Sequence, residues 1–240
     1  MIKVELNNNI AYVEFEDKAH GNQLKFSTIK EFYDTFYKLR HKSIKFIILS
    51  SSNKGHWLEH AHLKDIHNLS KNKKTSAHGK YWFKLIKEIR NEDVVYIAAI
   101  NGNASGGGAE LGWFFDFRIS QKNVYFSQPE VDFGICPGLG GISMLSCLIG
   151  PSIANQIVMT GDKYSSTQLH DLGLINILSK KGQIKKDSLE LANFLSLKSN
   201  TALSSIKKIF NNYYSKNNQL LEYEQKTFLE SINNLKTLET

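Results

Sequence analysis

The stretch Val94-Val-Tyr-Ile-Ala-Ala-Ile-Asn-Gly-Asn-Ala-Ser-Gly-Gly-Gly-Ala-Glu110 joins an apolar run to a glycine-rich segment. The apolar run, Val94–Ile100, is typical of a strand buried in a parallel sheet. Glycines then occupy positions 102, 106, 107 and 108, which predicts a turn that opens a helix. Backbone N–H groups at a helix start are unpaired and the helix dipole favours negative charge, so we expect this turn to bind an anion.

The glycine spacing excludes one familiar alternative. A dinucleotide-binding turn requires G-x-G-x-x-G, which these four positions do not match. Three successive glycines allow a ligand to approach the main chain, because no Cβ stands in the way. A purely structural role, in which the glycines only permit close helix packing, stays open at this point.

Two carboxylates lie near the turn in the sequence. Glu110 follows the glycines by two residues, and Glu130 comes just after Pro129 on a loop that leads to the segment Gly134-Ile-Cys-Pro-Gly-Leu-Gly-Gly141. Carboxylates on separate elements can converge on one water, where burial and repulsion raise one pKa so that one acts as base while the other carries a proton. Taken singly, each glutamate has a structural reading; their joint position favours acid–base chemistry.

Strand and helix patterns alternate over the first half of the chain. A polar loop is expected between residues 49 and 81, and the remaining patterns are strands at Ile10–Phe15, Ile44–Leu49 and Val94–Ile100 and helices at Phe26–Leu39 and Tyr81–Ile89. This alternation predicts βαβ units.

Beyond Pro151 the strand signals fade, and helical patterns dominate. One short strand pattern remains, at Leu174–Leu178, and the helical patterns are Leu189–Leu195, Ala202–Phe210 and Leu220–Ile232. We therefore expect an α/β core over residues 1–185 and a helical region over residues 186–240. The chain has three prolines and no repeats, so no rigid linker is predicted between them.

Composition places the chain among ordinary globular proteins. Of its 240 residues, 41% are apolar and 22% are charged, which excludes disordered and collagen-like chains. The longest apolar run is far shorter than the roughly 20 residues that cross a bilayer, and the N-terminus lacks a signal-peptide pattern. Two cysteines, Cys136 and Cys147, form no disulfide framework. We expect a soluble, cytoplasmic protein in a reducing compartment.

The formal net charge of +7 is compatible with several partners: nucleic acid, an acidic carrier protein or a phosphorylated cofactor. The lysines are scattered, which favours a solvated surface. Five histidines lie between residues 56 and 78, a density that could indicate a metal site. No matched set of cysteines or carboxylates accompanies them, so we expect no metal site. Trp57, Trp82 and Trp113 are candidates for an apolar binding pocket or, more simply, for the core.

Three sequence blocks together resemble the crotonase superfamily, the enoyl-CoA hydratases and isomerases. They are Ala99–Leu111, Ser127–Gly141, and Leu148–Gly150 running on to Met159–Gly161 and Leu172–Leu174. The resemblance covers about residues 1–215. It implies an α/β spiral of ββα and βαβ turns with a helical C-terminal trimerisation region, and hence homotrimers or dimers of trimers.

The resemblance also implies roles for individual residues. The backbone N–H groups of Ala61 and Gly107 would stabilise a thioester enolate in an oxyanion hole. Glu110 would activate the water that attacks Cβ, and Glu130 would deliver a proton to Cα. The residues implied in binding the substrate and its CoA are His20, Gly21, His62, Leu63, Lys64, Gly106 and Gly108. No cofactor is expected besides the CoA that belongs to the substrate.

This chain departs from the family pattern at three places. In Leu58-Glu-His-Ala-His-Leu63, His60 replaces the usual glycine and His62 the usual aspartate, so the loop loses a glycine while the backbone N–H of Ala61 is kept. Ser143 and Met144 replace a frequent Gln-Arg pair. The sequence ends about a helix earlier than is usual, so we expect part of the clamp on the adenosine end of CoA to be missing or rebuilt.

Three functions remain open from the sequence. The leading one is hydration of a 2-enoyl-CoA, or the reverse elimination. The second keeps the chemistry but places the thioester on an acyl carrier protein, as in polyketide-type dehydration. The third is a catalytically inactive relative that binds acyl thioesters or RNA.

Overall fold

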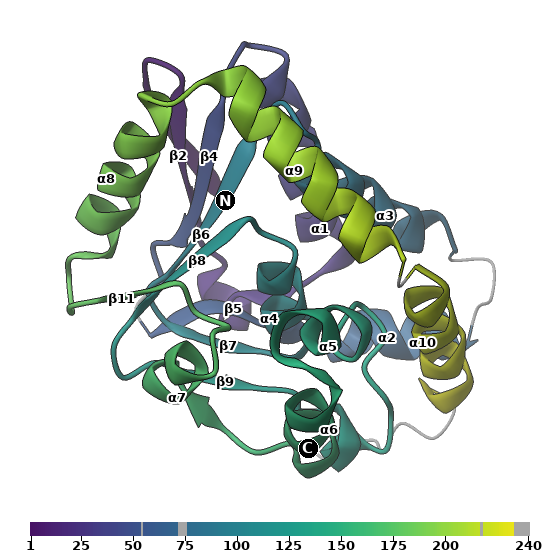
Figure 1. Cartoon of the computed structure of the whole chain (residues 1–240). Helices are drawn as coiled ribbons and strands as arrows, with labels where there is room; N and C mark the ends of the chain where they lie inside the picture. Colours follow the sequence, from purple (N-terminus) through teal and green to yellow (C-terminus); the bar gives the residue numbers. More distant parts are fainter. Residues whose placement is uncertain (54, 72–75, 217, 233–240) are drawn as a thin grey trace.

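The computed structural model describes residues 1–53, 55–71, 76–216 and 218–232 (Figure 1). Its first sheet has the strand order β1-β2-β4-β6-β8-β11. Its strands are β1 (Ile2–Asn7), β2 (Ile10–Phe15), β4 (Phe46–Ser51), β6 (Val95–Ile100), β8 (Phe117–Gln121) and β11 (Ile177–Ser179). The β1–β2 pair is antiparallel and the other pairs are parallel, as the alternating strand and helix patterns predict.

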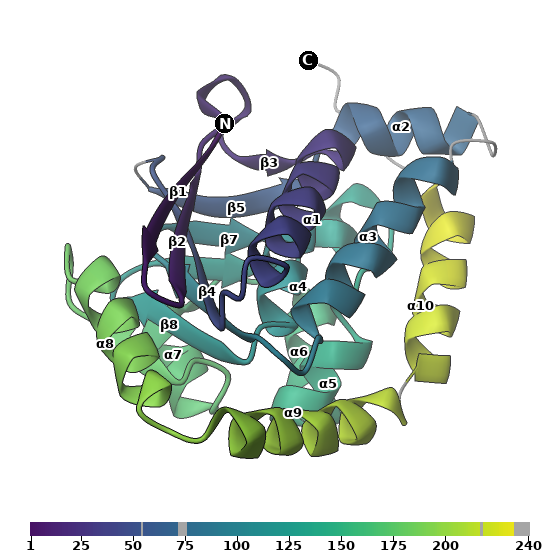
Figure 2. The same cartoon turned by 90° about the horizontal axis from the view of Figure 1, so that it is seen from above.

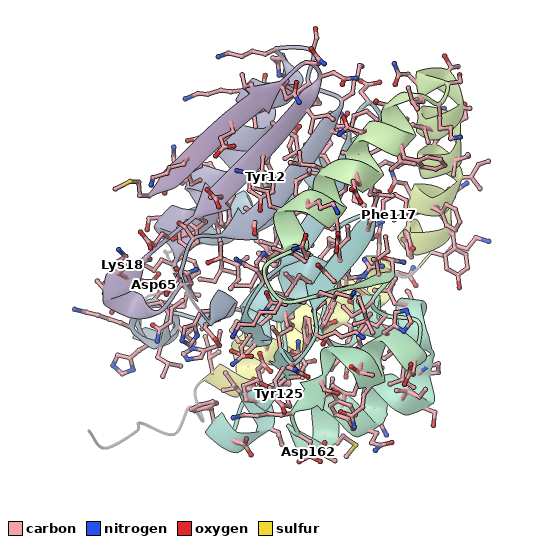
Figure 3. All side chains as sticks on the ribbon, turned by 90° about the vertical axis from the view of Figure 1, so that its left-hand side faces the viewer. Tyr12, Lys18, Asp65, Phe117, Tyr125 and Asp162 are labelled. Atoms are coloured by element: carbon pink, nitrogen blue, oxygen red, sulfur yellow. The ribbon has the colours of Figure 1, made fainter. Side chains whose placement is uncertain are left out.

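A second sheet has the order β10-β9-β7-β5-β3. Its strands are β3 (Gln23–Leu24), β5 (His56–Ala61), β7 (Asn103–Ser105), β9 (Tyr125–Ser127) and β10 (Tyr164–Ser165). Each of β2, β4, β6 and β8 is followed along the chain by a strand of this second sheet. The backbone therefore winds as a spiral of strand–strand–helix turns. Figure 3 labels Tyr12 and Phe117 on the first sheet and Tyr125 on the second.

Helices cover both sheets. Helices α1 and α3 lie side by side in Figure 2, with α2 and α10 beside them at one edge of the molecule. The helices are α1 (Phe26–Arg40), α2 (Leu63–Lys71), α3 (Ser76–Ile89), α4 (Gly106–Trp113), α5 (Ser143–Ile149), α6 (Pro151–Thr160), α7 (Ser166–Asp171), α8 (Ile184–Ser196), α9 (Asn200–Ser215) and α10 (Asn218–Ser231). Short 3₁₀ helices span Lys18–His20 and Pro129–Phe133.

The core follows from the alternation of side chains along the strands. In β4, Ile47 and Leu49 belong to the cluster that contains Phe36 of α1, whereas Phe46 and Ile48 belong to a second cluster with Ala192 of α8. All four β4 side chains are fully buried. Each such side chain contributes about 1.5–3 kcal/mol, which holds the spiral against α1 on one face and α8 on the other.

The polar loop predicted between residues 49 and 81 is wrong over much of its length, because it contains β5 and α2. In β5, Trp57 and Leu58 are buried. The polar residues conceal the strand because they pair with each other: His56 Nδ1 lies 2.7 Å from Glu59 Oε1, and Ser105 Oγ donates to Glu59 Oε2 at 2.5 Å. The strands β1, β3, β7, β8, β9 and β10 also have no counterpart among the predicted strands.

The C-terminal helices are confirmed as α8, α9 and α10, each longer than its sequence pattern. Helix α8 shares a hydrophobic cluster with β2, β4 and β6, so residues on both sides of the expected boundary at residue 185 pack together. The two-part division itself stays a prediction. Trp57, Trp82 and Trp113 are all buried. Within the described ranges, none of the helices has the length and apolar character needed to cross a membrane.

Candidate active site

A cavity of about 910 Å³ lies between helices α2, α3 and α10 and the segment that follows β9. Its walls are largely apolar, and Glu110 and Glu130 both line it, together with Glu222 and Glu230 of α10. Apolar residues of the lining include Leu24, Leu63, Ile66, Trp82, Phe133, Leu139 and Phe228. A concave apolar site with few polar groups is the usual form of a small-molecule site.

Gly107 and Ala61 meet at the wall of this cavity. Gly107 is the second residue of α4, and Ala61 is the last residue of β5. A Cβ on Gly107 would lie 3.6 Å from the backbone N of Ala61 and 3.3 Å from Leu139 Cδ1. The two backbone segments to which the family resemblance assigns an oxyanion hole therefore lie side by side, one of them at the start of α4.

The three successive glycines differ in what surrounds them. Gly106 has a left-handed φ of +45°, and a Cβ there would meet Glu130 Oε1 at 2.6 Å. A Cβ on Gly108 would meet the carbonyl oxygen of Leu58 at 2.3 Å, so this glycine permits α4 to approach β5. Of the three, Gly107 lines the cavity, whereas Gly106 and Gly108 lie against protein atoms.

Glu110 lies three residues after Gly107 on α4, which places both on one helix face. The Glu110 residue is 1% exposed. Its Oε1 accepts hydrogen bonds from the backbone N–H groups of Leu139 and Gly141, at 3.2 and 2.8 Å. The carboxylate is thus held by the second glycine segment, 29 and 31 residues further along the chain.

Glu130 reaches the same cavity from the 3₁₀ helix Pro129–Phe133. Its Oε2 is buried and has no hydrogen-bond partner among the described residues. Burial raises the pKa of Glu130 from 4.5 to about 7, and the charge of Glu224 acts in the same direction. A buried carboxylic oxygen that lacks a partner and has a near-neutral pKa is suited to carrying a proton.

Burial also raises the pKa of Glu110 well above its ordinary value, and the neighbouring charges of Glu130 and Glu224 add to this. The N–H groups of Leu139 and Gly141 act in the opposite direction, because they stabilise the ionised form. Two interacting carboxyl groups titrate as a pair. This arrangement can hold one proton on one glutamate while the other accepts a proton from water.

Glu224 is a residue that the sequence reasoning missed. It lies on α10 and is 3% exposed. Its carboxylate accepts hydrogen bonds from the backbone N–H groups of Gly140, Ile142 and Ser143, at 2.9, 3.3 and 2.8 Å. A single glutamate in an amphipathic helix gives no sequence signal for such a role, because these partners lie more than 80 residues away.

Other residues predicted to bind substrate lie outside the cavity lining. They are His20, Gly21, His62 and Lys64, and only Leu63 of that predicted group lines the cavity. His62 Nδ1 lies 2.8 Å from Gln23 Oε1, and the rings of His62 and His20 pack edge to face. Burial lowers the pKa of His62. Helix α2 is tied to the start of α1 by a hydrogen bond from the N–H of Phe26 to Asp65, which Figure 3 labels.

Helix α10 covers one side of the cavity. It contributes Gln225, Lys226 and Phe228 to the lining, and a Cβ on Gly138 would overlap the ring of Phe228. Helix α10 therefore places a lysine and an aromatic residue at this cavity. That part of the clamp on the adenosine end of CoA is missing or rebuilt stays a prediction.

The histidine-rich stretch is spread over β5, α2 and α3, with His62 between β5 and α2. Within the part of the chain that the structure describes, no three His, Cys, Asp or Glu side chains are grouped as metal ligands. The side chain of His78 lies outside that part. His60 lines the cavity, and its Nδ1 lies 2.9 Å from the carbonyl oxygen of Ala61.

The family model described as enoyl-CoA hydratase/isomerase matches residues 5–239 of the chain. Over 178 residues the chain is 32% identical to a crotonyl-CoA hydratase of Syntrophomonas wolfei, which covers 73% of this chain and 67% of that protein. Over 200 residues it is 29% identical to a short-chain-enoyl-CoA hydratase of Clostridium acetobutylicum, which covers 79% and 76% of the two chains.

The fold is also that of solved structures. The crystal structure of enoyl-CoA hydratase from Bacillus halodurans superposes with a TM-score of 0.86 at 21% sequence identity, covering 96% of this chain and 94% of the other. This likeness confirms the predicted crotonase-like α/β fold.

Proposed function

The chain belongs to the enoyl-CoA hydratase/isomerase family of enzymes, and we propose that it adds water across the 2,3 double bond of a 2-enoyl-CoA thioester or removes it in reverse. The observation that carries this proposal is the pair Glu110 and Glu130 on the walls of one apolar cavity, beside Gly107 and Ala61. The relatives named as crotonyl-CoA and short-chain-enoyl-CoA hydratases support the same reaction.

Hydration begins at the water. In the proposed mechanism Glu110 takes a proton from the water while the water oxygen forms a bond to C3 of the enoyl group. The backbone N–H groups of Leu139 and Gly141 donate hydrogen bonds to Oε1 of Glu110 and fix this oxygen. In the proposed mechanism the other carboxylate oxygen, Oε2, faces the water. The electron pair of the double bond moves toward the thioester oxygen, so an enolate forms.

The enolate oxygen is stabilised by the backbone N–H groups of Gly107 and Ala61. The start of α4 supports this assignment, because the helix dipole favours negative charge there. A donor aimed at developing charge in a water-poor site is worth about 3–4 kcal/mol of the barrier.

Glu130 completes the reaction by donating its proton to C2 of the enolate. Its pKa of about 7 supports this role, because a group half-protonated near neutral pH can both give and regain a proton. After product release, the proton that Glu110 took from the water restores the protonated state of the pair. The net change is one water added.

Two carboxylates favour hydration over double-bond migration. Migration needs one group that carries a proton between C2 and C4, whereas hydration needs one group for the water and one for C2. The paired glutamates of this cavity supply both. No specific observation favours an acyl carrier protein or RNA as the partner.

The test is the absorbance of the conjugated thioester, followed with crotonyl-CoA and with longer 2-enoyl-CoAs. Loss of absorbance, with 3-hydroxyacyl-CoA identified as product by mass spectrometry, is the expected result. Migration of the double bond in 3-enoyl-CoA with no hydration of any 2-enoyl-CoA would refute the proposal.

We also propose that the chain assembles as a homotrimer or a dimer of trimers. Helix α9 supports this with a set of exposed apolar side chains: Ile206, Ile209, Phe210 and Tyr213. Light scattering during size-exclusion chromatography measures the mass of the assembly, and a monomer at micromolar concentration would contradict the proposal.

A further inference from the structure

Residues 139–143 form a strap whose backbone N–H groups donate to two buried carboxylates, Glu110 and Glu224. On one side, the N–H groups of Leu139 and Gly141 donate to Oε1 of Glu110, at 3.2 and 2.8 Å. This side faces the cavity that holds the proposed catalytic pair.

On the other side, the strap donates to Glu224 of α10. Gly140 N–H and Ile142 N–H donate to Oε1 at 2.9 and 3.3 Å, and Ser143 N–H donates to Oε2 at 2.8 Å. Ionised carboxylates accept such bonds strongly. Among the described residues no lysine, arginine or histidine forms an ion pair with Glu224, so its negative charge is met by backbone N–H groups.

The strap has a backbone conformation that needs such anchoring. Gly140 has a φ of +112°, and a Cβ there would stand 2.7 Å from the ring of Phe114. A Cβ on Gly141 would stand 2.6 Å from Glu110 Oε1. Two glycines in succession give the strap little intrinsic stiffness, and Glu224 holds the amides on either side of Gly141.

We propose that Glu224 is a positioning residue for the hydration reaction, which holds the strap so that two N–H groups aim at Glu110 and places a third negative charge beside the carboxylate pair. This inference rests on the proposed function for its kinetic consequences. Glu224 itself does not line the cavity, so it acts through the strap and through its charge.

The charge of Glu224 acts on both members of the pair. It contributes to the raised pKa of Glu110 and to that of Glu130. The charges of Glu224 and Glu110 also act on the thiol of Cys136, whose pKa is raised chiefly by burial. The remaining charged residues of the lining stand on α3 and α10: Lys80, Glu222, Lys226 and Glu230.

The test compares Glu224→Gln with the wild type. Glutamine keeps the shape and one acceptor oxygen but loses the charge and the contact with Ser143 N–H. We expect both limbs of the pH profile of kcat/KM to move to lower pH, and kcat to fall about tenfold or more. The KM should change less, because Glu224 does not touch the cavity.

A second readout does not require turnover. The ¹³C signal of the Glu110 carboxyl group, assigned by its absence in Glu110→Gln, should titrate at lower pH in Glu224→Gln than in the wild type. Glu190→Gln is the matched control, because it removes one negative charge from a side chain that is 65% exposed on α8. It should change neither the titration nor kcat.

The outcomes separate the inference from the proposed function. A folded Glu224→Gln with lower kcat but an unchanged Glu110 titration and unchanged pH limbs would make Glu224 merely structural and overturn the inference. A wild type that hydrates no enoyl-CoA, but whose Glu110 titration still moves in Glu224→Gln, would refute the proposed function alone.

If Glu224→Gln does not fold, Glu224→Asp keeps the charge with a shorter reach. Wild-type kcat in that variant would overturn the positioning role, and a lower kcat at similar KM would support it.

Discussion

The carboxylate of Glu130 occupies the space that a side chain on Gly106 would fill, since a Cβ there would stand 2.6 Å from Glu130 Oε1. Gly106 precedes the cavity-lining Gly107 at the start of α4. The proposed proton donor is therefore packed directly against the helix start that is proposed to stabilise the enolate.

Glu130→Gln should lower the rate of hydration by about 10²–10⁴-fold, because the change removes a proton carrier without altering shape. Binding of the saturated acyl-CoA should survive, as measured by calorimetry. Unchanged hydration would remove Glu130 from the mechanism.

The same variant should become more stable relative to the wild type as the pH rises. The pKa of Glu130 is raised from 4.5 to about 7. Because the carboxyl group loses its proton more easily in the unfolded chain, the unfolding free energy of the wild type falls between pH 4.5 and 7. Glutamine does not titrate, so the unfolding free energy of the variant minus that of the wild type should grow by about 3 kcal/mol over that window. Urea unfolding at pH 5 and pH 8 measures the difference, and equal differences at both would contradict the raised pKa.

Glu110→Gln should lower hydration to a similar extent, since the water would lose the group that accepts its proton. The glutamine oxygen can still accept from Gly141 N–H, so the melting temperature should fall little. Assays with 2-enoyl-CoA and 3-enoyl-CoA should be run side by side. If hydration is abolished while double-bond migration persists, the cavity serves isomerisation as well.

Gly107→Ala and Gly108→Ala form a matched pair. A methyl group on Gly107 would meet Leu139 Cδ1 at 3.3 Å, so the fold should tolerate it, whereas substrate binding and turnover should both weaken. A methyl group on Gly108 would meet the carbonyl oxygen of Leu58 at 2.3 Å, and overpacking of this kind costs about 1–3 kcal/mol or more. Melting temperatures measured beside kcat and KM distinguish the two. Full activity in Gly107→Ala would show that the thioester does not lie at this wall.

Local patterns in the sequence determined the elements of the proposed site. The apolar run before residue 100 predicted β6, the glycines predicted the start of a helix, and the spacing of Gly107 and Glu110 places both on one face of α4. These features depend on residues a few positions apart. The α/β class and the C-terminal helices followed in the same way from periodicity.

Tertiary structure alone decided which of these elements meet. Glu224 lies 84 residues from Gly140, and no pattern in α10 marks its carboxylate as the anchor of the strap. The strand β5 was not predicted because its side chains are largely polar. In the structure His56 pairs with Glu59, and Glu59 also accepts a hydrogen bond from Ser105, 46 residues further along the chain. Packing of the whole chain determines which residues far apart in sequence become hydrogen-bond partners. The presence of a glutamate in the sequence indicates only that its carboxylate, if buried, needs hydrogen-bond donors. Which donors it finds is therefore fixed only when the helices and sheets are packed together.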